Sequence, residues 1–420
     1  MSFSFVHAAD LHLDSPFEGI TAQSERVAGA LRSATFEAYD ALIRLCIDRE
    51  VDFLLLAGDV YDGADRSLRA QMRFHDGLKR LRQHGIRAFV VHGNHDPLDG
   101  RSASIRWDQV AHVYDGEAVG TEIVAVDGKP VAAVSGISYP TRDERRNLAR
   151  MFQARHPELF QIALLHCNCG GKPGHEGYAP CSLEDLTGGG FDYWALGHVH
   201  TPSVEHERPY VVYPGNTQGR SIREPGERGC CLVTVHDGWV VDLERCPLDV
   251  VRWTSVPVSI QEKTSLDELI DDLSASLEQA RQDADRRGVV CRVVLEGRGL
   301  LYSDLKVEKD FADLLDRLRN EGESQEPFVW VEKIENRCRP TIDLAQRREV
   351  RDLLGELLAI SQGLRNGGEL GESLQEVFAD LHGHAVASEV PGLDDLSDEE
   401  LEGILSDAEF LCADLLEAEQ

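Results

Sequence analysis

Five short apolar runs in the first half of the chain each lead into a side chain that can bind a metal ion. The runs cover residues 3–9, 52–57, 87–92, 161–165 and 192–196. The residues that follow them are Asp10 and His12, then Asp59, then Asn94, then His166, and finally His198 and His200. Residues 26–50 and 68–84 have helical spacing and separate the first three runs. Because the carboxyl ends of strands meet at one edge of an α/β sheet, this order predicts an α/β domain in which these side chains gather.

The donor types in this series indicate what the gathered side chains can do. Carboxylate, imidazole and amide oxygen suit Mn²⁺, Fe²⁺ or Zn²⁺. A lone histidine after a strand is more often a loop or core residue, so only the whole series argues for a metal site. A pair of divalent cations can bind a phosphate and activate a water, and Asp59 is the candidate carboxylate that reaches both ions. His198 and His200 are two residues apart and point to one side of an extended segment, so one short loop can serve both ions.

Several motifs carry a family resemblance. They are Asp10-x-His12, Gly58-Asp59-x-x-Asp62, Gly93-Asn94-His95-Asp96, His166 and Gly197-His198-x-His200. The series resembles the calcineurin-like metallophosphoesterases. Stretches at 178–186, 191–200 and 213–220 make it most similar to bacterial DNA-repair exonucleases of the YhaO type, relatives of the nuclease component SbcD. The resemblance implies a four-layer metallophosphoesterase β-sandwich flanked by helices over residues 1–248.

The resemblance also implies a role for each site residue. The first metal would be bound by Asp10, His12, Asp59 and His200, and the second by Asp59, Asn94, His166 and His198. His95 resembles the group that protonates the leaving oxygen, with a structural turn histidine as the alternative. Asp62 resembles the acid that orients this histidine. Arg220 and Asn216 belong to a motif near the family's site, so we expect both to bind substrate. Mn²⁺ is the metal we expect.

The second half of the chain has a different organisation. Residues 250–338 alternate strand, helix, strand, helix, strand, which predicts a small α+β domain that resembles the capping domain of SbcD-type nucleases. Residues 340–420 are acidic and helical, with helices expected near 350–360, 372–382 and 401–416. Their apolar stripes fit packing on the cap or docking onto a partner helix. The resemblance implies an ATPase of the structural-maintenance type (YhaN-like or SbcC-like) as partner, and a homodimer is also a candidate.

The net charge of −31 bears on the substrate, because phosphate binding normally needs a basic surface. Residues 1–250 carry a net −10 and residues 351–420 carry −16, so the acidity is concentrated in the tail and does not exclude a nucleic-acid substrate. Two arginine clusters are candidates for phosphate contact on helices, with a solvated helix face as the equal alternative. They are Arg66, Arg69 and Arg73, and Arg142, Arg145, Arg146 and Arg150.

The location of the protein is constrained by what its sequence lacks. There is no apolar run of transmembrane length, and the first residues do not resemble a secretory signal. We therefore expect a cytoplasmic protein that is not embedded in a membrane.

Three functions remain open at this stage. The first is a two-metal-dependent phosphodiesterase acting on DNA in repair, as a 3′–5′ exonuclease and single-strand endonuclease. The second is a metallophosphoesterase for a cyclic nucleotide, a nucleotide or a phosphoprotein. The third is a non-enzymatic scaffold, which is disfavoured because no ligand position has been lost. The cap, the tail and the 178–220 matches favour the first.

Overall fold

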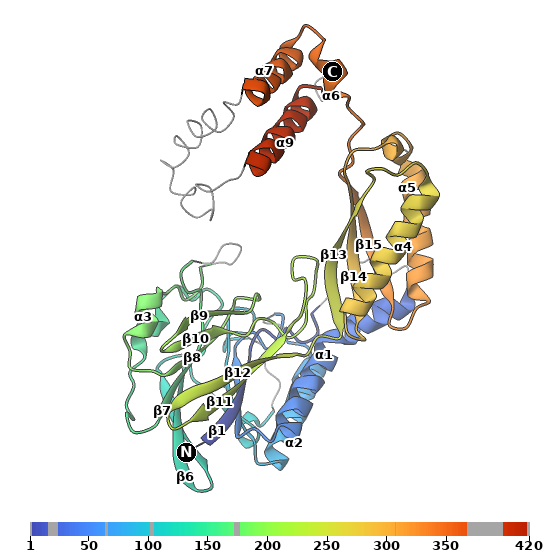
Figure 1. Ribbon diagram of the computed structural model, residues 1–420. Helices are drawn as coiled ribbons and strands as arrows, with labels where there is room; N and C mark the ends of the chain where they lie inside the picture. Colours follow the sequence, from blue (N-terminus) through green and yellow to red (C-terminus); the bar gives the residue numbers. More distant parts are fainter. Residues whose placement is uncertain are drawn as a thin grey trace. The chain divides into compact units, whose positions relative to one another are not determined.

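The computed structural model describes residues 2–15, 24–63, 66–100, 105–171, 177–306, 308–367 and 398–417 (Figure 1). The chain divides into two compact units. The first comprises Met1–Gly297 with Ser303–Arg337, and the second comprises Arg298–Tyr302 with Cys338–Gln420. The helix expected at 372–382 lies outside the described residues.

Two six-stranded sheets form the centre of the first unit. The first sheet has the order β12-β11-β1-β2-β3-β4, and the second has the order β5-β6-β7-β8-β10-β9. The strands of the first are β1 (Ser2–Ala8), β2 (Phe53–Ala57), β3 (Arg87–Val91), β4 (His112–Val113), β11 (Gly229–His236) and β12 (Trp239–Pro247). Those of the second are β5 (Gly120–Val126), β6 (Lys129–Gly136), β7 (Phe160–His166), β8 (Tyr193–Gly197), β9 (Ser203–Glu207) and β10 (Tyr210–Tyr213). Strands β1 to β4 are parallel to one another, as are β6, β7, β8 and β10.

Helices cover the outer faces of the two sheets. Helices α1 (Glu25–Asp48) and α2 (Leu68–Gln83) pack on the first sheet, and α3 (Leu183–Thr187) lies on the side of the second (Figure 1). Phe53 and Leu55 of β2 face the core between the sheets, whereas Leu54 and Leu56 face the helices. A strand buried on both faces needs a continuous apolar run, as the sequence has at 53–57. The predicted four-layer sandwich is confirmed.

A three-stranded parallel sheet follows the sandwich. Its strands, in the order β13-β14-β15, are β13 (Val251–Ser259), β14 (Gly288–Glu296) and β15 (Val329–Asn336). Helices α4 (Leu266–Asp283) and α5 (Glu308–Glu323) connect them, and the side chain of Ser265 caps α4. Val27 and Leu31 of α1 pack with Trp253, Phe328 and Trp330 of this sheet region. This three-stranded region, residues 250–338 and here called the cap, therefore shares a hydrophobic core with α1 of the sandwich.

The second unit is helical in its described part. It contains α6 (Leu344–Arg348), α7 (Leu353–Gly367) and α9 (Asp398–Glu417). Leu354 and Leu358 of α7 are buried with Ala413 of α9. None of the described helices is long and apolar enough to cross a bilayer. Across both units, the described residues also form short 3-10 turns at Trp107–Gln109, Leu148–Met151, Leu300–Tyr302 and Asp304–Lys306.

Candidate metal centre

The predicted donors converge where the central strands of the two sheets end. Asp10 and His12 follow β1, Asp59 follows β2 and Asn94 follows β3, while His166 ends β7 and His198 and His200 follow β8. The donor atoms of Asp10, His12 and His200 lie within 4.8 Å of one another, as do those of Asp10, Asp59 and His166. Two groups of donors thus lie side by side across the seam between the sheets.

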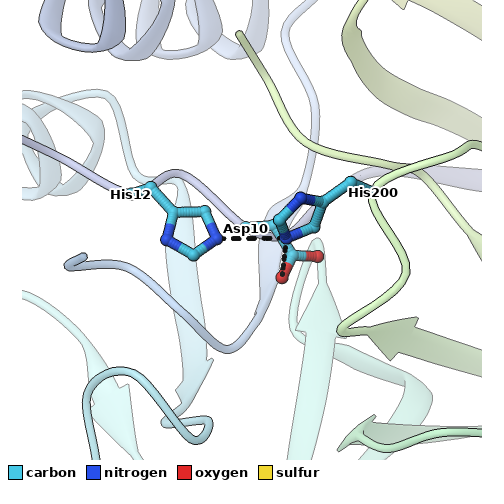
Figure 2. A group of neighbouring side chains, drawn as sticks. All are labelled: Asp10, His12 and His200. Carbon is cyan, nitrogen blue, oxygen red and sulfur yellow. Dashed lines mark hydrogen bonds and ion pairs between the residues drawn. The ribbon is translucent and has the colours of Figure 1, made fainter. Parts of the chain in front are cut away.

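The first group is centred on two facing imidazoles. His12 Nε2 lies 3.2 Å from His200 Nε2, and His200 Nε2 lies 3.7 Å from Asp10 Oδ1 (Figure 2). The other ring nitrogen of His200, Nδ1, lies 2.6 Å from Glu224 Oε1. Because a carboxylate can only accept, Nδ1 carries the hydrogen. In the neutral ring the Nε2 lone pair therefore points into the group, as metal-binding histidines require.

The second group shows the same arrangement around His166. Its Nδ1 donates to the main-chain oxygen of Ala57 at 2.8 Å, so the neutral ring has its lone pair on Nε2. That atom lies 3.0 Å from Asn94 Oδ1 and 3.4 Å from Asp59 Oδ2, which are both acceptors. Acceptors facing one another in a buried site need a proton or a cation between them.

The charges of the second group agree with this reading. Burial disfavours the charged form of His166, but the neighbouring Asp59 carboxylate outweighs it and raises the pKa of His166 to about 9. Burial opposes ionisation of Asp59 too, and His166 nevertheless brings the Asp59 pKa well below its usual value. Without metal the two form an ion pair, and a divalent cation can take the place of the proton. The residues present therefore fit divalent metal ions.

Asp59 belongs to the second group and also reaches toward the first. Its Oδ2 is 3.4 Å from His166 Nε2 and 3.9 Å from His12 Nε2. His198 borders the second group, with its ring centroid 5.2 Å from that of His166. The main-chain N–H of His198 donates to Asp10 at 3.0 Å, which ties the end of β8 to the end of β1.

The backbone around these donors is strained and crowded. Asp10, His12, Asp59 and His198 all have positive φ values, between 43° and 100°, which are uncommon for residues other than glycine. A Cβ at Gly93 would clash with Asp59 Oδ1 and lie 2.7 Å from His166 Nε2. Only glycine at this position lets the loop after β3 pass so close to both side chains.

His95 and Asp62 are in contact, although through the main chain of Asp62. His95 Nδ1 lies 2.8 Å from the Asp62 carbonyl oxygen, and His95 N–H donates to Asp59 Oδ1 at 2.9 Å. The Asp62 carboxylate instead accepts from Arg220 Nη1 at 2.7 Å and lies 3.1 Å from His12 Nδ1. The imidazole of His95 is edge-on to that of His12, with 4.8 Å between ring centroids. His95 thus borders the first group, and its donor atom lies within 4.8 Å of those of His12 and Asp62.

Of the two residues expected to bind substrate, only Arg220 borders the site. Asn216 is fully buried, and its amide donates to Gln218 O and to Glu224 Oε2, each at 2.9 Å. It therefore holds Glu224 rather than facing a substrate. Glu224 itself was not predicted, because it follows no apolar run and stands in no motif singled out above.

Asp96 is a further residue whose role the sequence did not reveal. Its buried carboxylate accepts from the main-chain N–H of Val60 at 2.9 Å and of Gly93 at 2.8 Å, and lies 3.0 Å from His92 Nδ1. These contacts join the loop after β2 to the loop after β3. Asp96 thereby sets the distance between Asp59 and the donors that follow β3.

The two arginine clusters are largely engaged within the chain. Arg66 precedes α2, is buried, and donates to the main-chain oxygens of Asp96 and Pro97. The helix expected around Arg142–Arg150 is wrong. The structure has a 3-10 turn there, at Leu148–Met151. Asp143 and Glu144 each pair with an arginine two positions away, a spacing that an α-helix does not bring together. The third pair is made by Asp185, from a distant part of the chain. The paired arginines are Arg145, Arg146 and Arg150.

Comparison with known proteins places this centre in a family. The family described as "Calcineurin-like phosphoesterase" matches residues 3–202, and "Metallophosphoesterase YhaO, middle domain" matches residues 253–339. The metallophosphoesterase YhaO of Bacillus subtilis is 34% identical over 338 residues, which are 79% of this chain and 81% of that protein. The chain belongs to the YhaO metallophosphoesterases. The predicted family is thus confirmed, and this family is one of hydrolases.

Nucleases are among the relatives at lower identity. The DNA double-strand break repair protein Mre11 of Methanopyrus kandleri is 26% identical over 329 residues, 72% of this chain and 66% of that protein. The SbcD component of the nuclease SbcCD of Bacillus subtilis is 25% identical over 258 residues, 53% of this chain and 63% of that protein.

Proposed function

We propose that this chain is a two-metal-dependent phosphodiesterase that acts on DNA, as a 3′–5′ exonuclease and single-strand endonuclease. The observation that carries the proposal is the pair of adjacent donor groups, with Asp59 Oδ2 3.9 Å from His12 Nε2 of the first and 3.4 Å from His166 Nε2 of the second. Asp10, His12, Asp59 and His200 would hold one cation. Asp59, Asn94, His166 and His198 would hold the other. When bound, such cations polarise a phosphodiester and lower the pKa of a bound water. Mn²⁺ is the metal we propose.

The remaining site residues have distinct roles in this proposal. The Asp62 carbonyl takes the hydrogen of His95 Nδ1 and so aims Nε2, from which the protonated ring donates to the leaving oxygen. Arg220 is 18% exposed at its side chain and adds a fixed positive charge beside the donors. A guanidinium in this place suits a phosphate oxygen. Its pair with Asp62 keeps it aligned while no substrate is bound.

Three features favour DNA over a small phosphate ester. Relatives at lower identity are named for DNA double-strand break repair and for a nuclease. The cap packs on α1 within the same compact unit as the sandwich, where it can limit which substrates reach the centre. The net charge of −10 over residues 1–250 is small, and two bound cations would add +4 at the site itself.

We also propose a cytoplasmic protein, active in DNA repair, that works with an ATPase of the structural-maintenance type (YhaN-like or SbcC-like) and pairs with a second copy of itself. The C-terminal helices support the ATPase contact, because they expose large apolar side chains. These are Leu353 and Ile360 on α7, and Leu411 and Leu415 on α9. Leu411→Ser and Leu415→Ser together should abolish ATPase binding in a pull-down without lowering the melting temperature. Retained binding would contradict docking through this face.

One experiment tests the proposed activity. Purified protein with Mn²⁺ is given labelled linear DNA, a single-stranded DNA circle and bis-p-nitrophenyl phosphate, beside an Asp59→Ala control. We expect degradation of linear DNA from its 3′ ends, nicking of the circle and cleavage of the small diester, all absent in the control. Cleavage of the small diester with both DNAs left intact, in the presence of the ATPase, would reject a DNA substrate.

A further inference from the structure

The segment from residue 214 to 228, here called loop 214–228, connects β10 to β11 and passes the first donor group. Its Glu224 accepts from His200 Nδ1 at 2.6 Å, from the main-chain N–H of Arg220 at 2.8 Å and from Asn216 Nδ2 at 2.9 Å. Arg220 Nη2 also donates to Glu224 Oε1 at 3.3 Å, so the carboxylate has four donors and a fixed orientation. His200 is held in the tautomer that presents Nε2 to the site.

The same loop is fastened to the cap on its other side. The indole Nε1 of Trp253, on β13, donates to Gly219 O at 3.0 Å, and the Trp253 carbonyl accepts from Gly226 N–H at 2.9 Å. Gln218 donates to Val251 O at 2.6 Å and accepts from Val250 N–H at 2.8 Å. Trp253 and Gln218 are almost completely buried, so water does not compete for these bonds.

The loop is closely packed between its contact with His200 and its contacts with the cap. A Cβ at Gly219 would lie 2.6 Å from Glu224 O and 3.3 Å from Trp253 Cδ1. The backbone of Gly219 is therefore packed closely against both Glu224 and the cap. Asn216 bridges Gln218 O and Glu224 Oε2 with one amide group. A displacement of β13 would therefore reach Glu224 through only a few close-packed groups.

We propose that loop 214–228 couples the cap to the metal centre, with Glu224 as the positioning residue of His200 and Trp253 as the anchor of the loop in the cap. The inference rests on the proposed metal centre and adds to it a route by which the cap's position sets metal affinity. A carboxylate on the far nitrogen of a metal-binding histidine fixes the ring and raises its basicity, and its loss typically costs about 10- to 100-fold in metal affinity.

The first test measures Mn²⁺ binding to the full-length protein by calorimetry, without DNA. We expect Glu224→Ala to weaken one of two Mn²⁺ sites by about 10- to 100-fold and to leave the other unchanged. Glu224→Gln, whose amide oxygen can still accept from His200, should weaken it less. Arg223→Ala removes an exposed charge from the same loop and should bind like the wild type. Equal affinity of Glu224→Ala and wild type would overturn the proposal, as would equal weakening of both sites.

The second test addresses the anchor. Trp253→Phe keeps an aromatic ring in the cap core but removes the hydrogen bond to Gly219. We expect it to weaken the same Mn²⁺ site by up to about tenfold, the range that one lost hydrogen bond allows. Trp330→Phe, in the same core on β15, controls for loss of packing and should leave Mn²⁺ affinity unchanged. Equal effects of the two variants, or none, would overturn the coupling.

These readouts separate the inference from the proposed function. A wild-type protein that binds two Mn²⁺ ions but leaves DNA intact would reject the DNA substrate and not the coupling. Conversely, active DNA cleavage with unchanged Mn²⁺ affinity in Glu224→Ala would reject the coupling and leave the proposed activity standing.

Discussion

His95 Nδ1 lies 2.8 Å from the main-chain oxygen of Asp62, whereas the Asp62 carboxylate pairs with Arg220. The imidazole is thus oriented by a group that no side-chain substitution removes. His95→Asn should keep Mn²⁺ occupancy and lose about 10²- to 10⁴-fold in phosphodiesterase rate, the usual contribution of a general acid. Steady-state hydrolysis of bis-p-nitrophenyl phosphate, with metal content measured by mass spectrometry, checks both parts. Full activity would remove His95 from the mechanism.

The same contact predicts a different result for Asp62→Asn. This variant keeps the carbonyl that orients His95 and loses only the charge that faces Arg220 and His12. We therefore expect a smaller loss of rate than in His95→Asn, together with a raised KM if Arg220 loses its alignment. A pH–rate profile of both variants gives the comparison. An Asp62→Asn rate as low as that of His95→Asn would mean that the carboxylate itself acts in the reaction.

Gly93 gives a prediction about metal binding rather than chemistry. Gly93→Ala places a methyl group against Asp59 Oδ1 and His166 Nε2, two donors of the second group. Because the surrounding strand ends are buried and cannot retreat, we expect loss of Mn²⁺ at this site and no measurable hydrolysis. Gly63→Ala, where a Cβ meets nothing within 4 Å, is the matched control. Normal Mn²⁺ affinity in Gly93→Ala would show that the loop after β3 can move.

The convergence of donors could be predicted because each donor follows a strand that the sequence marks clearly. Strands β2, β7 and β8 are continuous apolar runs, and the rule about carboxyl ends then places Asp59, His166 and His198 without any knowledge of the long-range contacts. The packing of Leu31 against the cap could not be predicted. An apolar helix face in the sequence does not name the surface that covers it.

The contacts that the loops make could not be predicted from the sequence, for a related reason. Glu224 and His200 are 24 positions apart and meet only because loop 214–228 folds back on the end of β8. The motif around Asn216 was correctly placed near the site, but its burial was not visible. In the arginine stretch before Leu148, local pairing with Asp143 and Glu144 replaces the expected helix.

The contact between α1 and the cap predicts a stability effect. Leu31 is 3% exposed and packs in the core shared with Trp253 and Trp330. Leu31→Ala should lower the free energy of unfolding by about 2 to 5 kcal/mol, the range for a buried leucine. Urea unfolding followed by tryptophan fluorescence measures this loss of stability, because the indole rings of Trp253 and Trp330 lie in this core. Leu266→Ala, 42% exposed in the first turn of α4, should change the free energy far less.

His7 predicts how stability depends on pH. It is fully buried in β1, between Tyr193 OH and Leu196 O, each 3.1 Å from a ring nitrogen, and burial lowers its pKa to about 3. The unfolded chain takes up a proton at this residue below the usual histidine pKa of about 6.5, and the folded chain does not until near pH 3. This contribution is therefore fully present above pH ~6.5 and is lost as the pH falls through that window.

The size of the His7 effect can be measured against a variant that does not titrate. Between pH 7 and pH 5 the wild type should lose about 2 kcal/mol of unfolding free energy more than His7→Gln does, since each unit of pKa difference is worth about 1.4 kcal/mol. Urea unfolding with a chelator present keeps metal release out of the comparison. His236→Gln replaces an exposed histidine and should keep the wild-type pH dependence. Parallel pH profiles for the wild type and His7→Gln would mean that His7 binds its proton equally well in the folded chain.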